Sequence, residues 1–466
     1  MEKRNSFSGS IGFVLAAAGS AVGLGNIWRF PYLAAKDGGG LFLAVYLVLA
    51  LTFGFTLLVT EVSIGRKTKQ GCLTAYGKLK KGWGWLGGFA SVVPFLIMPY
   101  YCIIGGWVLK YAIVFITGAG LDGVAGDSYF TDFIMSPVAP IVFTAIFMAA
   151  TCFVVFRGVN KGIESLSKVL MPILIVLVLG IAIFSLTING NSKTDGRTGM
   201  DGLMVYIIPS FDGITADKFF TVVMDAMGQL FYSISVAMGI MVTYGSYFKD
   251  EDNLMRSVNQ IEIFDTVVAF LAGVMIIPAV YVFSGAKGMS SGGPGLMFKT
   301  LPKVFAEMGG LGRFVGAVFF VMVLFAALTS SVSILEAVAS GVIDKTKLSR
   351  KKTVIIEGVV AFILAVIICF GYNKNIFFFN IKLPNGNDAQ LLDIFDYVSN
   401  NILMPIVAIG TCVLVGWFVK PKTVIEEATK NGERMLRKGL YIVMVKVVAP
   451  ILLCFLLLAS LGIIRI

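Results

Sequence analysis

Long apolar stretches separated by short polar segments fill this sequence. An α-helix rises about 1.5 Å per residue, so roughly 18 apolar residues are enough to cross the hydrocarbon core of a membrane. We therefore expect an all-α polytopic membrane protein in which the whole chain, 1–466, forms one transmembrane domain. The pattern predicts eleven membrane-spanning helices, at about residues 11–36, 39–65, 88–117, 136–156, 163–187, 220–247, 257–284, 311–343, 352–371, 391–418 and 438–464.

The predicted helices divide into two halves and one extra helix. Five helices over 11–187 and five over 220–418 suit a pair of inverted five-helix repeats, and the helix at 438–464 is then peripheral. No residue-level repeat is visible, and the correspondence lies in interruptions of the first helix of each half, helices 1 and 6 of the chain.

Small and polar residues cause these interruptions. Gly19, Gly23 and Gly25 interrupt helix 1, and the stretch from Ser233 to Ala237 interrupts helix 6. Unwound backbone at membrane depth is stable only where protein or a wet cavity satisfies its polar groups. Close helix packing is the other explanation for a membrane glycine, but Asn26 and Arg29 follow directly and favour a binding cavity.

Composition and charge agree with a membrane protein. Hydrophobic residues make up 57% of the chain and charged residues 14%, against about 25% charged in soluble domains. The net charge of +11 comes from Lys and Arg in alternate loops, chiefly at 66–81, 345–352 and 420–438. The positive-inside rule places these loops and the N-terminus in the cytoplasm, and we expect no nucleic-acid partner. We also expect the N-terminal segment to be retained, because no cleavage pattern follows its apolar run.

The residue types available exclude most membrane chemistry. The sequence contains no histidine, which removes His-based metal sites, Ser-His-Asp triads and the usual proton shuttle. The six cysteines are scattered and predict no disulfide framework. We therefore do not expect an enzyme.

A few ionisable and hydroxyl side chains fall inside the apolar spans. Each buried charge costs about 2.5–3.5 kcal/mol, so each needs a partner. Asp265 suits a cation site, although an interhelical hydrogen bond is the alternative. Glu61 and Glu336 suit a structural role in bonding unwound backbone amides. Thr329 and Ser330 suit either back-bonding to their own helix or ligation of sodium.

The motifs resemble those of one transporter family. The run from Gly19 to Pro31 (GSAVGLGNIWRFP), followed by Gly38-Gly39-Gly40, closely resembles the first-helix signature of the neurotransmitter:sodium symporters. The stretches 229–235 and 326–331 resemble the broken sixth helix and the eighth helix of that family. The resemblance extends along nearly the whole chain, and it is closest to the bacterial amino-acid branch. It implies a multi-pass protein of the bacterial inner membrane, acting as a monomer or a weak homodimer in the lipid bilayer.

The resemblance also implies site residues. The first of two Na⁺ ions would bind Ala21, Asn26, Ser233 and Asp265. The second would bind Gly19, Val22, Ala326, Thr329 and Ser330. The substrate amino acid would contact Ala21, Gly23, Leu24, Gly25, Ile97, Tyr101, Tyr232, Ser233, Ser235, Met238, Ser330 and Ile334. An outer gate would pair Arg29 with Asp396 through water, and an inner latch would pair Arg4 with Asp344 near Phe7.

Departures from the family pattern bear on ions and substrate. Asp265 stands where the bacterial leucine carrier has asparagine, and Ala269 stands where that carrier has an acid. Animal members use chloride where such a carboxylate is absent, so we expect chloride independence. Tyr232 replaces the usual phenylalanine lid, and Val236 to Met238 replace a more glycine-rich stretch, which predicts a stiffer break. The apolar lining of Ile97, Met238 and Ile334 favours a neutral, hydrophobic L-amino acid.

The sequence thus predicts a sodium-coupled symporter that works by alternating access. A cation channel of the same residues is the first rival, but two broken helices in one chain suit an occluded central site better than a continuous pore. A membrane receptor that senses an amino acid without moving it is the second rival, and the sequence leaves it open.

Overall fold

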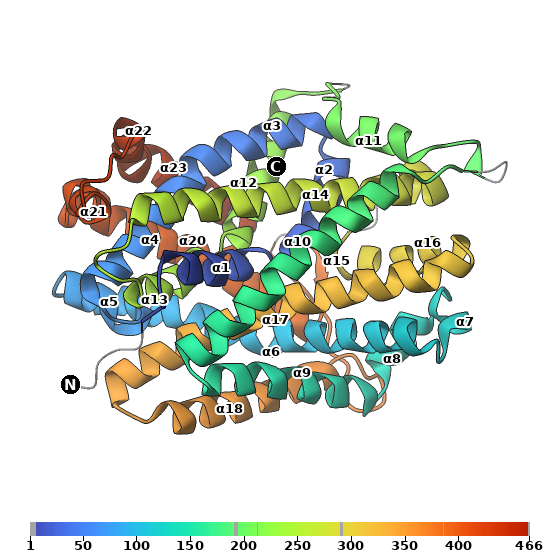
Figure 1. Ribbon diagram of the computed structural model, residues 1–466, viewed down its shortest axis with the longest axis horizontal. Coiled ribbons are helices and arrows are strands. Elements are labelled where there is room, and N and C mark those ends of the chain that lie inside the picture. Colours follow the sequence, from blue (N-terminus) through green and yellow to red (C-terminus); the bar gives the residue numbers. More distant parts are fainter. Residues whose placement is uncertain (1–5, 191–193, 212, 289–291, 385, 465–466) are drawn as a thin grey trace.

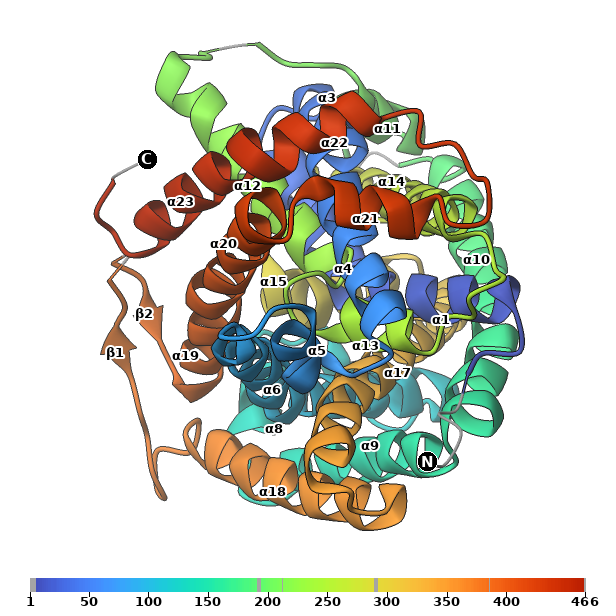
Figure 2. The same ribbon diagram turned by 90° about the vertical axis from the view of Figure 1, so that its left-hand side faces the viewer.

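The computed structural model describes residues 6–190, 194–211, 213–288, 292–384 and 386–464. The described chain is an elongated bundle in which most of the long helices run nearly lengthwise (Figure 1), with some helices at its centre and others around them (Figure 2). Its interior consists of buried side chains. This architecture confirms the predicted all-α polytopic class.

Helices make up nearly all of the regular structure. In chain order they are α1 (Ser10–Ala21), α2 (Phe30–Lys36), α3 (Gly40–Leu49), α4 (Phe55–Thr68), α5 (Cys72–Leu79), α6 (Gly84–Thr117), α7 (Leu121–Val124), α8 (Tyr129–Met135), α9 (Ala139–Phe156), α10 (Ser165–Leu186), α11 (Gly199–Ile207), α12 (Ala216–Ser233), α13 (Ile240–Ser246), α14 (Leu254–Gly288), α15 (Gly293–Gly295), α16 (Leu301–Glu307), α17 (Gly310–Thr346), α18 (Arg350–Phe370), α19 (Leu391–Asp396), α20 (Met404–Val413), α21 (Pro421–Ala428), α22 (Lys438–Val443) and α23 (Ala449–Ser460). Two short strands, β1 (Ile381–Lys382) and β2 (Asp388–Ala389), pair antiparallel with Ile381 opposite Ala389.

Wider π-helical turns join several of these helices. They are η1 (Gly25–Arg29), η2 (Ala50–Gly54), η3 (Val159–Glu164), η5 (Leu296–Thr300), η6 (Tyr397–Leu403), η7 (Leu414–Phe418) and η8 (Met444–Val448). A π-turn inserts a residue into the helical ladder and is frequent at functional sites. The turn at η1 lies directly after the predicted break in helix 1.

Nine described helices are long and apolar enough to cross a membrane. They are Gly40–Thr68, Gly84–Thr117, Ala139–Phe156, Val159–Leu186, Leu254–Gly285, Gly310–Thr346, Arg350–Phe370, Leu391–Phe418 and Lys438–Ser460. A bent pair, Ser10–Ala21 with Gly25–Lys36, brings the number to ten. In place of one continuous helix over the predicted span 220–247, the structure has two shorter helices, α12 and α13, separated by a break. The count of eleven and the two inverted repeats stay predictions.

The interior of the bundle is formed by a few of these helices. Helices α4, α6, α13 and α17 lie inside it, whereas α9, α18 and α23 lie on its rim (Figure 2). Polar side chains that the sequence analysis singled out, such as Asp265 and Thr329, are buried in this interior. The fold therefore places the broken helices and their polar groups away from lipid.

Candidate functional site

Glycines at the break in helix 1 allow side chains of α12 and α17 to approach its backbone. Helix α1 ends at Ala21, and the chain bends by 49° before Gly25–Lys36. A Cβ atom at Gly23 would lie 2.8 Å from Ser330 Oγ, and one at Gly25 would lie 2.7 Å from Tyr232 Cδ1. Both distances are too short for a real Cβ contact, so a larger residue at either position would displace the neighbouring side chain. The same two glycines thus allow close helix packing and also line the binding cavity.

The break in helix 6 is held in a strained conformation. Helix α12 ends at Ser233 and α13 begins at Ile240. Between them Ser235 (φ 55°) and Ala237 (φ 59°) have positive φ angles, which cost an L-residue about 1 kcal/mol or more. The Ala237 amide donates to Glu61 Oε1 at 2.6 Å. Glu61 on α4 therefore has the predicted structural role, and it supports a break that lacks the family's glycines.

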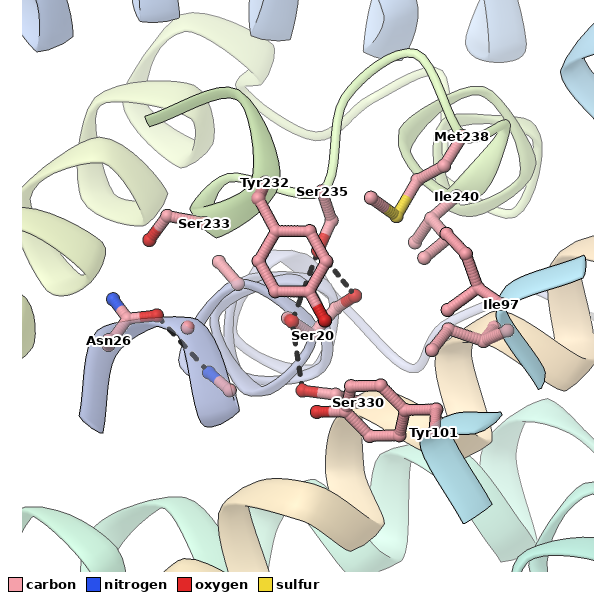
Figure 3. Close-up of a pocket in the computed structure, with 14 residues that line it drawn as sticks. Ser20, Asn26, Ile97, Tyr101, Tyr232, Ser233, Ser235, Met238, Ile240 and Ser330 are labelled. Atoms are coloured by element: carbon pink, nitrogen blue, oxygen red, sulfur yellow. Dashed lines mark hydrogen bonds between the residues drawn. The ribbon is translucent and has the colours of Figure 1, made fainter. Parts of the chain in front are cut away.

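A central cavity lies between the two breaks (Figure 3). Its volume of about 20 Å³ is small for an amino acid, so a bound substrate requires the lining side chains to shift. Eleven of the twelve predicted substrate residues line it, and Leu24 is buried beside it. The lining residues are Ser20, Ala21, Gly23, Gly25, Asn26, Ile97, Tyr101, Tyr232, Ser233, Ser235, Met238, Ile240, Ser330 and Ile334.

The cavity has a polar end and an apolar end. Figure 3 shows Asn26 and Ser233 on one side and Ile97, Met238 and Ile240 on the other. Asn26 and Ser233 lie on η1 and at the end of α12, whereas Ile97 comes from α6, Met238 from the break before α13 and Ile240 from the start of α13. A small molecule with one charged end and one apolar end fits this polarity.

Two cavity residues were missed from the sequence. The Ser20 carbonyl accepts from Ser235 Oγ at 3.1 Å and from Ser330 Oγ at 3.0 Å, so it links both breaks to α17. Ile240 adds apolar surface at the first turn of α13. Ser20 could have been predicted from its position between Gly19 and Gly23. Ile240 could not, because it is one of many apolar residues in the chain.

A buried carboxylate lies beside the polar end. Asp265 on α14 is fully buried. Its Oδ1 accepts from Asn26 Nδ2 at 2.8 Å and from Ser233 Oγ at 2.6 Å, and its Oδ2 accepts from Tyr46 OH at 3.2 Å. All three donors are neutral, and no Lys or Arg pairs with Asp265 among the described residues. A buried negative charge without a cation is costly, so this cluster is suited to bind one.

The donor set points to a hard monovalent cation. The cluster offers carboxylate, amide and hydroxyl oxygens, which sodium-like cations prefer over soft metals. Among the residues that the structure describes, no group of three His, Cys, Asp or Glu side chains could hold a metal ion. A single carboxylate is enough for one positive charge. Tyr46 is the member that the sequence did not reveal, because it is distant in the chain and looks like an ordinary apolar-span aromatic.

The residues of the second predicted sodium site also come together in part. Ser330 Oγ lies 3.3 Å from the Gly19 carbonyl, and Thr329 Oγ1 lies 3.1 Å from the Ala326 carbonyl. A Cβ atom at Gly19 would lie 3.3 Å from Thr329 Cβ, so α1 and α17 touch here. Val22 is fully buried and follows the last residue of α1. The hydroxyls back-bond to their own helix or reach across to α1.

A second, larger cavity adjoins the first on the side of the predicted outer gate, and we call it the outer cavity. It has a volume of about 370 Å³ and is lined by Arg29, Tyr232, Asn400 and others. Tyr232 lines both cavities and therefore separates them, as a lid would. Arg29 and Asp396 form no direct salt bridge among the described residues. Instead Asp396 Oδ1 accepts from Asn400 Nδ2 at 2.6 Å, and Asn400 also donates to Tyr100 OH at 3.2 Å.

The residues of the predicted inner latch have other partners in the structure. Arg4, one half of the predicted latch, lies outside the described residues. Asp344, the other half, accepts from the Gly71 amide at 2.6 Å. Phe7 is buried against the rings of Phe13, Tyr244 and Tyr247.

Glu336 has a structural role, as predicted, but its partners differ from the predicted ones. It does not bond unwound amides in the structure, but accepts from Arg350 Nη1 at 2.5 Å, from Arg350 Nη2 at 2.9 Å and from Tyr247 OH at 2.5 Å. A charged partner on α18 satisfies it more strongly than amides would. The pair therefore joins α13, α17 and α18 near the inner end.

Comparison with known proteins identifies the family of this chain. Residues 4–122 and 137–465 match the model of the sodium:neurotransmitter symporter family. The chain belongs to this family. Membership establishes a sodium-dependent membrane transporter, not an enzyme.

Relatives of this symporter cover nearly its full length. An uncharacterized sodium-dependent transporter of Bacillus subtilis, YhdH, is 35% identical over 87% of this chain and 86% of its own. An uncharacterized sodium-dependent transporter of Haemophilus influenzae is 30% identical over 99% of both chains. The crystal structure of MhsT in complex with L-phenylalanine matches with a TM-score of 0.84 and 32% identity, covering 98% of this symporter and 100% of MhsT.

Proposed function

We propose that this symporter carries a neutral, hydrophobic L-amino acid together with two sodium ions, independently of chloride. The observation that carries the proposal is the two-ended cavity, in which the Asp265 cluster adjoins the polar end and Ile97, Met238 and Ile240 form the apolar end. The L-phenylalanine bound to MhsT supports the substrate class.

The cavity suggests how the substrate is oriented. Free amides around Leu24 and Gly25 begin the second half of helix 1, and such an amide end attracts a carboxylate. The Tyr101 hydroxyl is buried and forms no hydrogen bond with the described residues, so it is available as a further donor. The substrate side chain then extends toward Met238, whose flexible thioether adapts to different apolar shapes.

Sodium coupling follows from shared ligands. A sodium ion bound by Ala21, Asn26, Ser233 and Asp265 would also touch the substrate carboxylate, so each would strengthen the binding of the other by the same factor. The second ion would bridge Gly19 and Val22 of helix 1 to Ala326, Thr329 and Ser330 of α17, and would thereby tie helix 1 to the rest of the bundle.

Alternating access would use the contacts at the two ends. On the outer side, Tyr232 would move away from the cavity and the predicted water-mediated pairing of Arg29 with Asp396 would open. On the inner side, the contacts of Phe7, Arg4 and Asp344 would open. We assign the outer cavity to the extracellular face and the N-terminus to the cytoplasm of a bacterial inner membrane, in line with the distribution of Lys and Arg.

The test is uptake into liposomes that contain the purified protein. With an imposed inward sodium gradient, we expect accumulation of at least one labelled neutral hydrophobic amino acid above its equilibrium level, and no accumulation with potassium in place of sodium. A receptor would bind the amino acid without accumulation, and a channel would pass sodium without it. Either result would refute symport.

Chloride independence has its own test in the same liposomes. Uptake with gluconate in place of chloride should equal uptake with chloride, because the Asp265 carboxylate supplies the fixed negative charge. A fall to background would contradict this assignment while leaving sodium coupling intact.

The second ion is tested by removing its hydroxyl ligands. The double variant Thr329→Val and Ser330→Ala should raise the sodium concentration needed for half-maximal uptake by about tenfold or more, the effect of losing about 1.4 kcal/mol. Thr346→Val is the matched control, since Thr346 also back-bonds within α17 but is exposed at its end. An unchanged sodium dependence would remove the second site from the proposal.

A further inference from the structure

A groove runs along the rim of the bundle between α9 and α18. The two helices lie side by side in both views (Figures 1 and 2). The groove has a volume of about 560 Å³ and is open toward the surroundings of the bundle. Its lining is apolar and consists of Ala145, Met148, Ala149, Cys152, Phe153, Phe156, Val354, Ile355, Gly358, Val359, Phe362 and Ile363.

The groove faces lipid rather than water. Both helices are among the apolar membrane-spanning helices, and lining side chains such as Phe153 (60% exposed) and Ile355 (58% exposed) point outward. The floor is closed, because a Cβ atom at Gly358 would lie 2.7 Å from Cys152 Sγ. An open, dry hollow of this kind in a hydrocarbon layer is filled by an acyl chain, because an empty space forfeits dispersion contacts.

The length of the groove matches one leaflet. From Ala145 to Phe156 the chain advances eleven residues, or about 16 Å at 1.5 Å per residue. The hydrocarbon core is about 30 Å thick, so the groove spans about half of it. It lies at the end where α9 finishes and α18 begins, which the positive-inside rule assigns to the cytoplasmic leaflet.

Two cations stand at this end of the groove, each over a lining aromatic ring. Lys351 Nζ of α18 lies 5.2 Å from the Phe156 ring centre of α9, and Arg157 Cζ lies 5.6 Å from the Phe153 ring centre. Neither forms a salt bridge among the described residues. Of the nearby acids, Glu336 pairs with Arg350. Glu357 is buried on the other side of α18, where it lines a separate cavity and its carboxylate oxygens have no hydrogen-bond partner among the described residues.

We propose that this groove binds one anionic phospholipid, with an acyl chain along its floor and the phosphate between Arg157 and Lys351. Charge favours this occupant over a second copy of the chain. A twofold interface at this face would bring the same cations against one another, and like charges at close range repel. An anionic headgroup neutralises both.

The lipid would join two elements that reach the transport machinery. Beyond Arg157, α9 leads into the π-turn η3, and α18 begins with Arg350, whose partner Glu336 also accepts from Tyr247. A lipid held by both helices therefore stabilises their contact, and we expect it to raise the thermal stability of the protein.

The experiment compares phosphatidylglycerol and phosphatidylcholine with identical acyl chains, added to the full-length protein in detergent. Native mass spectrometry should show one retained phosphatidylglycerol per chain and much weaker retention of phosphatidylcholine. The variant Arg157→Gln with Lys351→Gln should lose this preference by about 10- to 30-fold, since each cation near a membrane surface is worth about 1 kcal/mol. The control Lys80→Gln with Lys81→Gln removes two exposed cations elsewhere, which form no salt bridge within the described part of the chain, and should bind like the wild type.

A second variant tests the groove itself. Ala149→Phe places a ring in the groove and should abolish retention of the lipid, while sodium-dependent stabilisation of the protein reports that the variant is folded. Equal retention of phosphatidylglycerol by the charge variant, or by the folded Ala149→Phe variant, would overturn the proposal. A dimer whose formation depends on this face and displaces the lipid would overturn it as well.

Discussion

At the scale of single residues, the site depends on a few small or charged side chains that no neighbour can replace. Asp265 gathers three neutral donors from three different elements, and Gly23 and Gly25 leave the space into which Ser330 and Tyr232 extend. The chemistry of the site is therefore concentrated in residues whose substitution has a definite consequence.

Loss of the Asp265 charge should weaken sodium binding. In Asp265→Ala the only carboxylate of the cluster is gone, so the sodium concentration for half-maximal substrate binding should rise by about tenfold or more. Tyr46→Phe is the matched control, because it removes a donor to the same carboxylate and leaves the charge, and its effect should be clearly smaller. Unchanged sodium dependence in Asp265→Ala would show that the first ion binds elsewhere.

A methyl group at Gly23 should block the cavity without unfolding the protein. In Gly23→Ala the new Cβ would lie 2.8 Å from Ser330 Oγ and 3.1 Å from Tyr101 OH. Both hydroxyls must retreat, so substrate binding measured by equilibrium dialysis should fall at least tenfold. Gly180→Ala, on α10 with open space around its Cβ position, should leave binding intact. Wild-type affinity in Gly23→Ala would contradict the placement of the substrate here.

At the scale of elements, the break between α12 and α13 is supported from outside. Ser235 and Ala237 have left-handed backbone conformations without the freedom of glycine, and Glu61 on α4 binds the Ala237 amide. The strain in one element is thus offset by a hydrogen bond from another, which makes α4 part of the site although it does not line the cavity.

Removing this support should destabilise the protein. Glu61→Ala leaves the buried Ala237 amide without its acceptor, at a cost of about 1–3 kcal/mol, and should lower the thermal unfolding midpoint in detergent. Glu61→Gln keeps an acceptor oxygen, so its unfolding midpoint should lie between those of the wild type and Glu61→Ala. Glu426→Ala on the surface of α21 is the control and should have little effect. A midpoint for Glu61→Ala equal to the wild type would mean that the break does not need this bond.

At the scale of the whole molecule, a cluster of charges links the end of α2, in the second half of helix 1, to α12 of helix 6. Lys36 Nζ, at the end of α2, lies 2.6 Å from Asp225 Oδ2 of α12 and 3.9 Å from Asp37 Oδ1. Asp37 lies between membrane spans but is only 5% exposed. Burial, and then the charge of Asp225, raise the pKa of Asp37 to about 7.

This shift predicts a pH dependence of stability. An unfolded aspartate ionises near pH 4, whereas folded Asp37 holds its proton up to about pH 7. Stability relative to a variant without this group should fall as the pH rises from about 4 to 7 and then level off. The free energy of unfolding of Asp37→Asn should therefore rise by about 1–2 kcal/mol relative to that of the wild type between pH 5 and pH 7.5. This range is reduced because the charge of Lys36 stabilises ionised Asp37. Thermal unfolding at the two pH values measures this gain. The control Asp122→Asn, at an exposed position, should show no such gain. The prediction would be contradicted if the stability of Asp37→Asn and that of the wild type changed in parallel with pH.

The sequence by itself determined the fold class, the approximate spans and most of the cavity. Apolar runs are long enough to be read without knowledge of their neighbours, and the stretch from Gly19 to Arg29 marks a break through residue types alone. The predicted substrate residues could be named because the chain resembles a known family, and all but Leu24 line the central cavity.

Only the tertiary structure decided which residues from distant parts of the chain complete the site. Tyr46 on Asp265, Ser20 between two hydroxyls, and Arg350 on Glu336 are pairings that depend on helix packing. The same holds for Tyr232, which separates two cavities, and for the strained Ala237, whose φ angle is tolerated because Glu61 is close. A local pattern records how one helix crosses the membrane, whereas these contacts arise from the way in which several helices meet.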